Sequence, residues 1–368
     1  PGPNTSTVID SAAPGKPSPR ADNNGGFSMK SKMAWMLSLT MFFGLLATAA
    51  GPAPVQAGPI TLSYANFPPA PTFPCVQMER WKNEVETRTD GKVRVNTFPG
   101  GTLLGAKDMM DGVIQGQADI GCLCMAYQPG RFMITNATSL PLGIPNARVG
   151  SLVLWDLYRQ YRPEAFAQVK VLAMFTTAPS NIMSKAPVRS LADIQGMDLR
   201  ASGGAAQILA AWGANQVGMP MSATPEALQK GVVKGLFSSL EVMKDFKYAE
   251  TCKYVTRTDT VIYPFSVVMN MASWNRLPED VKAAFDALAP EQSIWTGTYM
   301  DDHVAVANQW SKETQGVEFI TLSAEEKALW NERLAPITEQ WIKDAEANGY
   351  PGRQIVEDIE ALIEKHKK

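Results

Sequence analysis

The feature that most constrains the fold is an alternation of strand and helix patterns that begins near residue 59. In PITLSYANF, the apolar side chains of Ile60, Leu62 and Tyr64 share one face, which is typical of a half-buried strand. The segments that follow predict a helix at QMERWKNEVETRT, a strand at KVRVNTF, a helix over 103–116 and a buried strand at QADIGCLCM. The order β-α-β-α-β predicts an α/β fold with a mainly parallel sheet.

A second α/β pattern starts at VKVLAMF, residues 169–175, and continues through LADIQGMDLRAS. We expect a helix over 203–213 and another with Thr224 as its N-cap. A strand is expected over 261–271, and Pro278 is expected to open the next helix. The chain therefore predicts two α/β lobes, and small-molecule sites often form in the cleft between two domains.

The C-terminal region also carries helix signals. Ser323 and Glu326 form the pattern of a capping box. Behind them, four apolar residues recur at helical spacing: Trp330, Leu334, Ile337 and Trp341. Such a stripe usually packs into a core, and we interpret it in that way.

The N-terminal region carries an export pattern. Residues 1–28 are rich in Pro, Gly, Ser and Asn, which predicts a disordered extension or an artificial remnant. Two lysines, an apolar run and the A-x-A-like segment Val55-Gln56-Ala57 then predict a signal peptide over 29–57 that is removed by cleavage. An uncleaved membrane anchor is the alternative, because the apolar run is near the lower limit for a span. Cleavage predicts a protein of the periplasm.

We expect the remaining chain to divide into two lobes, each formed by two separate segments. Lobe 1 is predicted to contain residues 58–177 and 266–305. Lobe 2 is predicted to contain residues 178–265 and 306–368. Each lobe is then a sheet flanked by helices.

Composition argues against several classes of function. The 368 residues include 34 Lys and Arg against 36 Asp and Glu, without a long basic run, which disfavours nucleic acid as a partner. The two histidines are too few for a histidine-rich metal centre, and no cofactor is expected. We interpret Cys122 and Cys124 as buried packing residues. No nucleophile elbow, zincin or P-loop motif occurs, and we predict that the chain is not an enzyme.

One arginine gives the clearest indication of ligand binding. Arg200 lies at the end of a predicted strand, and Ser202 opens a Ser-Gly-Gly turn that leads into a helix. A guanidinium fork beside the backbone N–H groups of a helix N-terminus suits a carboxylate or a sulfonate. A surface or inter-domain salt bridge is the alternative for such an arginine.

Five segments occur in an order known from one protein family: FPGGTLLG, GVIQGQADIG, LADIQGMDLRAS, ALQKGVVKG and LPEDVKAAF. With them, the chain from about residue 59 to 365 resembles the DctP-like substrate-binding subunits of TRAP (tripartite ATP-independent periplasmic) transporters. The resemblance implies a two-lobed periplasmic binding protein fold with the ligand cleft between the lobes. It also implies capture of a solute by lobe closure, and delivery to a small and a large membrane permease subunit driven by an ion gradient. We expect a monomer.

The resemblance further implies that Arg200 binds the carboxylate of the ligand. The sequence departs from the family at Lys234, where Asp is usual, and at Ser238, the nearest equivalent of an asparagine that some members place against the carboxylate. The second arginine of the sialic-acid binders has no counterpart here. A single strong cation favours a monocarboxylate over a dicarboxylate. A partly aromatic wall is expected from four residues: Phe67, Met125, Tyr127 and Phe237.

Two other functions remain open from the sequence. A secreted enzyme acting on a small organic acid would use Arg200 to anchor its substrate. A ligand-sensing subunit of a membrane receptor would share the fold but not the transport partner. An aliphatic or aromatic monocarboxylate, a 2-oxo acid and a sulfonate are all compatible ligands.

Overall fold

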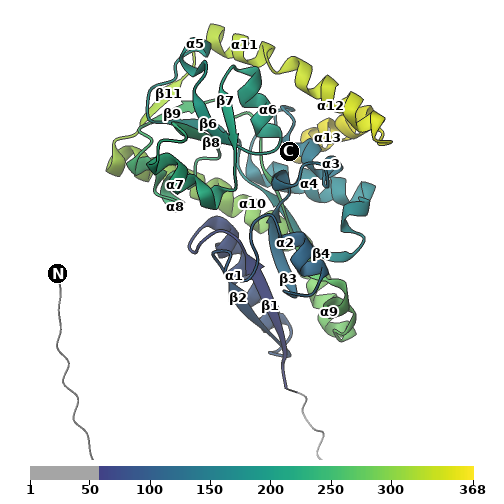
Figure 1. Ribbon diagram of the computed structural model, residues 1–368. Coiled ribbons are helices and arrows are strands. Elements are labelled where there is room, and N and C mark those ends of the chain that lie inside the picture. Colours follow the sequence, from purple (N-terminus) through teal and green to yellow (C-terminus); the bar gives the residue numbers. More distant parts are fainter. Residues whose placement is uncertain (1–57) are drawn as a thin grey trace, which may run out of the picture. The chain divides into compact units, whose positions relative to one another are not determined.

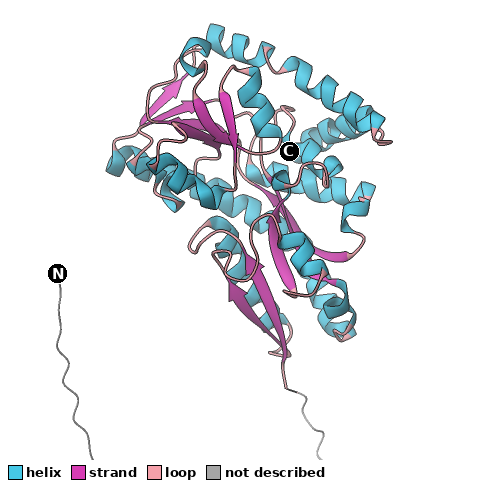
Figure 2. Ribbon diagram, viewed as in Figure 1, coloured by secondary structure: helices cyan, strands magenta, loops and turns pink. Residues whose placement is uncertain are grey.

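Two mixed β-sheets, both flanked by helices, organise the chain (Figures 1 and 2). The computed structural model describes residues 58–368, and the predicted extension and signal peptide lie outside them. Each sheet contains a single strand that runs against its neighbours: β10 (Pro264–Asn270) in the five-stranded sheet and β5 (Asn181–Ser184) in the six-stranded sheet. The predicted α/β class with mainly parallel sheets is confirmed.

The five-stranded sheet has the order β2-β1-β3-β10-β4. Its remaining strands are β1 (Ile60–Asn66), β2 (Val93–Phe98), β3 (Ile120–Cys124) and β4 (Val169–Thr176). Every residue of β3 and β10 is buried, as expected for central strands that helices cover on both faces. The segments ITLSYAN, VRVNTF and IGCLC thus form the strands that their patterns predict.

The six-stranded sheet has the order β11-β9-β5-β8-β6-β7. Its remaining strands are β6 (Asp198–Ala201), β7 (Asn215–Gly218), β8 (Gly235–Ser238), β9 (Tyr254–Arg257) and β11 (Glu318–Thr321). The chain passes between the sheets after β4, after β9 and after β10, so neither sheet is formed by one continuous segment. The division into two lobes at the predicted residues stays a prediction.

The helices, labelled in Figure 1, cover both sheets. Up to β10 they are α1 (Phe73–Arg88), α2 (Met109–Ile114), α3 (Met133–Asn136), α4 (Ala147–Tyr161), α5 (Leu191–Ile194), α6 (Gly204–Ala211), α7 (Thr224–Gln229) and α8 (Val242–Asp245). After β10 they are α9 (Met271–Asn275), α10 (Glu279–Gln315), α11 (Ala324–Glu332), α12 (Ala335–Ala347) and α13 (Gly352–His366).

Helix α10 is the element that links the two sheets. It begins after Pro278, as predicted, and ends at Gly316, whose φ of 63° lies in the left-handed region that favours glycine. On one side it packs against α1, α4 and β4, and on another against α8. Its 37 residues continue through Pro290, which a sequence reading would take as a stop. The buried face of the helix on both sides of Pro290 explains why the helix persists.

Three sequence expectations differ from the structure. The helix expected over 103–116 is only α2, because the segment before it forms turns around Gly105. Thr224 is the first residue of α7 rather than its N-cap, since a short 3-10 turn precedes it. The C-terminal stripe does not lie on one helix: Trp330 belongs to α11, whereas Ile337 and Trp341 belong to α12.

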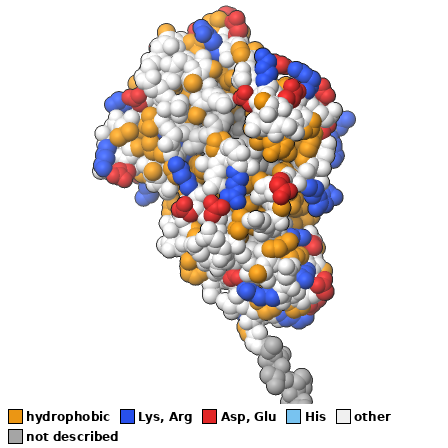
Figure 3. All heavy atoms as spheres, turned by 45° about the vertical axis from the view of Figure 1, so that its right-hand side comes forward, with side chains coloured by type: hydrophobic (Ala, Val, Ile, Leu, Met, Phe, Trp, Pro, Cys, Tyr) orange, Lys and Arg blue, Asp and Glu red, His pale blue; other side chains and the backbone are white. Residues whose placement is uncertain are grey.

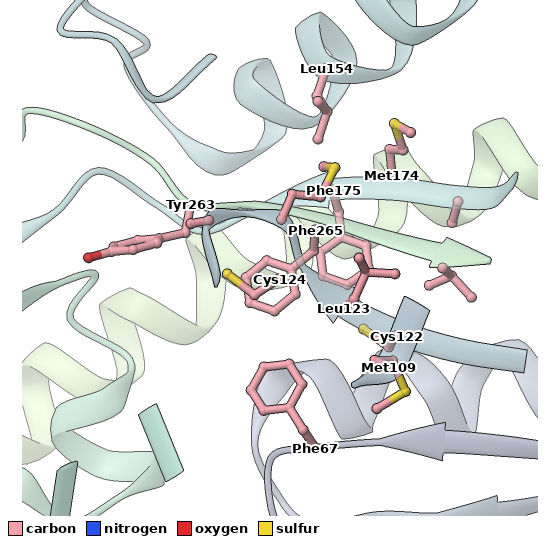
Figure 4. Close-up of a cluster of buried hydrophobic side chains, with 14 of the residues drawn as sticks. Phe67, Met109, Cys122, Leu123, Cys124, Leu154, Met174, Phe175, Tyr263 and Phe265 are labelled. Atoms are coloured by element: carbon pink, nitrogen blue, oxygen red, sulfur yellow. The ribbon is translucent and has the colours of Figure 1, made fainter. Parts of the chain in front are cut away.

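The core contains the sulfur side chains that the sequence assigned to packing. Cys122 and Cys124 are buried free thiols, which confirms that prediction; in Figure 4 Cys124 lies beside Phe265, and Cys122 lies beside Met109.

Trp330 packs on Trp212 at the end of α6 with ring centroids 4.6 Å apart, and Leu334 is also buried, whereas Ile337 and Trp341 are only partly buried. Among residues 58–368, no helix has the length and apolar content to cross a membrane.

Candidate functional site

Residues at the carboxyl ends of four strands, two from each sheet, converge on one cavity of about 40 Å³. Phe67 follows β1, and Tyr127 ends the short turn after β3. Arg200 lies near the end of β6, and Ser238 is the last residue of β8. In open α/β sheets, ligands bind in the crevice outside the carboxyl ends of the strands, so this cavity is the candidate ligand site.

Two walls of different chemistry enclose this cavity. What we call the aromatic wall comes from segments of the five-stranded sheet and consists of Phe67, Phe73, Tyr127 and Phe265. What we call the polar wall comes from segments of the six-stranded sheet and consists of Arg200, Ser238, Glu241 and Asp245.

The aromatic wall is part of a packed ring cluster. Phe265 of β10 lies at its centre, with ring centroids 5.6 Å from Phe73 and 6.3 Å from Phe67. On its far side, Phe265 stacks on Phe175 of β4 at 5.4 Å. Figure 4 shows Phe67 pointing toward Phe265 and Cys124, while the ring of Tyr263 extends away from them. The wall therefore presents an apolar surface that the core behind it holds in place.

Arg200 is the charged centre of the polar wall, and only 1% of its surface is exposed. Its Nε and Nη2 donate to the carbonyl oxygen of Met219 at 3.0 and 2.7 Å. Nη2 also lies 3.3 Å from the hydroxyl of Ser202 and 3.5 Å from that of Tyr127. These partners fix the plane of the guanidinium.

The same contacts leave one edge of the guanidinium available. Within residues 58–368, Nη1 of Arg200 donates no hydrogen bond, and no carboxylate forms a salt bridge with Arg200. Burial lowers the pKa of Arg200, but the nearby oxygens of Tyr127 and Tyr263 more than offset this, and the pKa lies above its ordinary value. A buried cation without an acidic partner is costly. The arrangement therefore suits an anion supplied from outside.

Gly203 brings the Arg200 loop against the aromatic wall. Its φ is 54°, and a Cβ at this position would lie 2.9 Å from the Cβ of Ala126, the residue before Tyr127. A side chain would push the loop away, because real Cβ atoms do not approach that closely. Glycine is therefore required for Tyr127 to reach Arg200, and the hydroxyl of Tyr127 also accepts from the N–H of Met221 at 3.0 Å.

Glu241 is a second charged group of the polar wall. It is 2% exposed, and its Oε2 has no hydrogen-bond partner among the described residues. Burial, with a smaller contribution from the neighbouring Asp245, raises the pKa of Glu241 to about 7, although the hydroxyl of Ser239 acts in the opposite direction. Unlike an ordinary surface glutamate, this carboxyl is close to half protonated near neutral pH.

Asp245 connects the polar wall to two other elements. Its Oδ1 lies 2.6 Å from Nε2 of His303 on α10, and its Oδ2 accepts from the N–H of Phe73 at 3.2 Å. The hydrogen bond to Asp245 raises the pKa of His303. His303 thereby helps to hold Asp245 in place.

The structure brings four of the seven predicted site residues to the cavity: Arg200, Ser238, Tyr127 and Phe67. Ser202 supports Arg200 from the side and donates to the carbonyl oxygen of Met219 at 3.0 Å. That these residues contact a ligand stays a prediction.

Met125 and Phe237 do not line the cavity. Met125 is fully buried, and its sulfur accepts from the hydroxyl of Thr135. Phe237 packs on Trp212 at 5.3 Å, because neighbouring strand residues face opposite sides and Ser238 takes the cavity side.

Sequence reasoning missed Glu241, Asp245, Phe73 and Phe265. Glu241 stands only three residues after Ser238, yet an isolated glutamate carries no burial signal. The hydrophobic pattern of β10 indicated that Phe265 is buried but not that it lies beside a cavity. These residues reach the site through the pairing of distant strands, which the sequence does not display.

Over its described residues, the face of the molecule shown in Figure 3 carries no large patch of charge of one sign. Basic and acidic side chains lie interspersed on the face shown in Figure 3. Across the described part of the chain, His, Cys, Asp and Glu side chains form no cluster that could hold a metal ion.

The family model of the bacterial extracellular solute-binding proteins, family 7 (DctP), matches residues 68–344. Among curated proteins, the solute-binding protein RD1_1052 of Roseobacter denitrificans is 25% identical over 279 residues, covering 71% of this chain and 84% of that protein.

Solved structures show the same likeness. A TRAP periplasmic solute binding protein from Desulfovibrio salexigens is 55% identical, with a TM-score of 0.75, covering 83% of this chain and 96% of that one. It is described as an open complex with the C-terminus of a symmetry mate in its ligand-binding site. A marine metagenome TRAP solute binding protein specific for aromatic acids, in complex with 3-hydroxybenzoate, is 28% identical, with a TM-score of 0.81, covering 85% and 100%.

Proposed function

Because the chain belongs to family 7 of the bacterial extracellular solute-binding proteins, we propose that its cavity captures a small organic monocarboxylate for a TRAP-type transporter. Solute binding in such a system follows from the family and from the TRAP solute-binding proteins that the chain resembles. The choice of a monocarboxylate rests on the site of this chain.

The observation that carries the proposal is the state of Arg200. It is buried and fixed by the Met219 carbonyl and by Ser202, and among residues 58–368 it keeps a free donor and has no acidic partner. A carboxylate would accept from Nη1 and neutralise the cation in a site of low dielectric constant. A single unpaired cation balances one negative charge, and Glu241 in the same wall would repel a second. A monocarboxylate therefore fits better than a dicarboxylate.

The aromatic wall favours a ligand with apolar surface opposite its carboxylate. Phe67, Phe73 and Phe265 would cover such a ligand, as small-molecule sites usually do. The relative that binds 3-hydroxybenzoate supports an aromatic acid as one member of the ligand class.

We infer that the two walls separate to admit the ligand. A cavity of about 40 Å³ is smaller than the roughly 150 Å³ that accommodates benzene in a protein core. The chain also has a higher TM-score to the liganded relative at 28% identity than to the open relative at 55% identity. Both observations support a closed arrangement. In this proposal residues 58–177 with 266–305 move against residues 178–265 with 306–368.

The proposal places the protein in the periplasm, where family relatives act, after removal of a signal peptide over 29–57, which lies outside the described residues. Its macromolecular partners would be the small and large permease subunits of a TRAP transporter. The solute-binding protein itself would act as a monomer.

A thermal-shift screen of purified residues 58–368 tests the proposal. The ligands are organic monocarboxylates, dicarboxylates, sulfonates and neutral sugars. A binder present at 100 times its Kd adds about 2.7 kcal/mol of stability, which raises the melting temperature visibly. We expect monocarboxylates to give the largest shifts. Arg200→Ala should weaken their binding by roughly 30-fold to several thousandfold, since truncating one member of a buried charge pair costs about 2–5 kcal/mol.

Arg189→Ala is the matched control, because the guanidinium of Arg189 is 56% exposed and pairs with Glu318 on the surface. This variant should bind like the wild type. The proposal is wrong if Arg200→Ala keeps wild-type affinity, or if only neutral compounds shift the melting temperature.

A further inference from the structure

Glu241 is a buried acid that the capture of a carboxylate does not require. It lines the same cavity as Arg200, yet the two side chains form no salt bridge with each other. A negative group in an anion site weakens the binding of any anion that approaches it. Glu241 can therefore remain in the polar wall of an anion site only if a favourable contact to its carboxylate offsets this repulsion.

The protein supplies only part of that contact. Neighbouring Asp245 has a partner for each oxygen, since Oδ1 lies against His303 and Oδ2 accepts from the N–H of Phe73. Glu241 sits in the same wall, but its Oε2 is fully buried and accepts no hydrogen bond of normal geometry within residues 58–368; the nearby hydroxyl of Ser239 lowers its pKa without forming such a bond. Buried polar atoms in native proteins are almost always hydrogen-bonded. The unpaired oxygen of Glu241 is thus left for a group that enters the cavity.

The chemistry of that group follows from the acceptor. The ionised form of Glu241 predominates above about pH 7, and an ionised carboxylate oxygen accepts hydrogen bonds but donates none. Its partner must therefore carry an N–H or an O–H. The aromatic wall offers no such group beyond the hydroxyl of Tyr127, which already contacts Met221 and Arg200.

We propose that Glu241 accepts a hydrogen bond from the ligand, so the natural ligand is a monocarboxylate that also carries a hydroxyl, amide N–H or ammonium group. This inference rests on the proposed function, because Arg200 must hold the carboxylate while Glu241 reads the second group. The two residues then fix the orientation of the ligand, and Glu241 determines specificity among acids of similar size.

Matched acids that differ in one group test the inference. The probes are benzoate, 3-hydroxybenzoate and 3-methoxybenzoate, then phenylacetate with 3-hydroxyphenylacetate, and butyrate with 4-hydroxybutyrate. Isothermal titration gives the ratio of Kd values within each set. In the wild type we expect at least one hydroxy acid to bind about tenfold or more tightly than its parent, as a hydrogen bond to a charged group allows. The methoxy acid, which cannot donate, should bind no better than benzoate.

Substitutions of Glu241 then assign the preference. Glu241→Leu should reduce the ratio to about twofold or less, since it removes the acceptor. Glu241→Gln keeps an acceptor oxygen and should retain part of the preference; it also serves if the leucine variant does not fold. Glu250→Gln is the matched control: it neutralises an exposed acid close in sequence that does not line the cavity, so the ratio should stay near that of the wild type.

The outcomes separate this inference from the proposed function. If hydroxy acids and their parents bind equally in the wild type while Arg200→Ala still abolishes binding, the role of Glu241 is wrong and the proposed function stands. An unchanged ratio in both Glu241 variants leads to the same conclusion. If no acid in the panel binds the wild type, both proposals fall together.

Discussion

The aromatic wall and the polar wall face the same cavity but are held in place differently. Phe265 packs against rings on both of its sides, so the aromatic wall is an extension of the core. Arg200 and Glu241 are equally buried but are not fully paired. The aromatic wall is packed like any protein core, whereas the polar wall keeps buried polar groups that lack hydrogen-bond partners among the described residues.

The difference indicates which wall serves stability and which serves binding. Departures from complete polar pairing are expected at functional sites, where stability is reduced to prepare for a ligand. Truncation in the aromatic wall should therefore destabilise the protein. Neutralising the acid of the polar wall should instead stabilise the empty protein and change its ligand preference. The three predictions below test this contrast, from the largest expected effect to the smallest.

The largest effect is expected for Phe265→Ala in the aromatic wall. Phe265 is 5% exposed and contacts Phe67, Phe73 and Phe175, so its removal leaves a cavity among packed rings. The free energy of unfolding should fall by about 3–5 kcal/mol. Urea denaturation followed by circular dichroism measures the change.

Phe246→Ala is the matched control for that loss. Phe246 also lines the cavity, but it follows α8 beside the polar wall, is half-buried and stacks on Tyr248 alone. Its truncation should cost less than half as much. Equal losses in the two variants would mean that the walls do not differ in how they support the core.

A smaller effect of opposite sign is expected for Glu241→Gln. Burial raises the pKa of Glu241 from an ordinary 4.5 to about 7, so the folded protein holds the proton more tightly than the unfolded chain. The stability that this proton contributes is present below about pH 4.5 and is lost as the pH rises to about 7. At pH 8 the variant should be more stable than the wild type by about 1–3 kcal/mol, and the gap should narrow at pH 5.

Urea denaturation at both pH values, without ligand, measures this gap. Glu250→Gln provides the comparison, since Glu250 is exposed and close in sequence. It should leave stability nearly unchanged at either pH. A wild type that is as stable as Glu241→Gln at pH 8 would show that the polar wall imposes no cost on the empty protein.

Much of the fold and one half of the site could be predicted from the sequence. Strand patterns identified β1, β2, β3 and β4, because alternation and continuous apolar runs are local signals. Arg200 could be identified because a charged residue at a strand end beside a glycine-rich turn is itself unusual. Phe67 and Tyr127 reach the cavity because both follow strands whose carboxyl ends meet there.

The rest of the site depends on contacts between distant segments. Phe265 faces the cavity only because β10 lies between β3 and β4 in the sheet. No local sequence pattern predicts that position. Met125 and Phe237 were expected to face the cleft from sequence position alone. Each packs inward instead, since Thr135 and Trp212 supply partners that the sequence does not place beside them.

The length of α10 shows the same limit. The sequence marks its start at Pro278, and Pro290 suggests an early end. Packing against α1, α4 and α8 carries the helix to Gln315 and brings His303 to Asp245. Tertiary contacts thus decide both the extent of the helix and the surroundings of the polar wall.

The smallest effect is expected for His303→Gln. This variant alters the contacts through which Asp245 links the polar wall to the aromatic wall, which we call the tie between the walls. Asp245 accepts from His303 on α10 and from the N–H of Phe73 in the aromatic wall. The pKa of His303 is raised by its hydrogen bond to Asp245, so the folded protein binds this proton more tightly than the unfolded chain. The stabilisation is fully present below about pH 6.5 and is lost as the pH rises through the raised pKa of the folded state.

The free energy of unfolding should therefore be about 1 kcal/mol higher with histidine than with glutamine at position 303 at pH 6. This difference should vanish near pH 9. The protein with His303 and the His303→Gln variant should both also carry Glu241→Gln. Without this change, release of the Glu241 proton over an adjoining pH range would obscure the difference in stability between them. His366→Gln serves as the control, since His366 pairs with Asp156 at 2.9 Å, away from the cavity. If the tie between the walls supports closure, His303→Gln weakens ligand binding a few-fold at pH 6 and His366→Gln does not. Parallel stability curves for histidine and glutamine at position 303 from pH 6 to 9 would instead show that Asp245 is held by Phe73 alone.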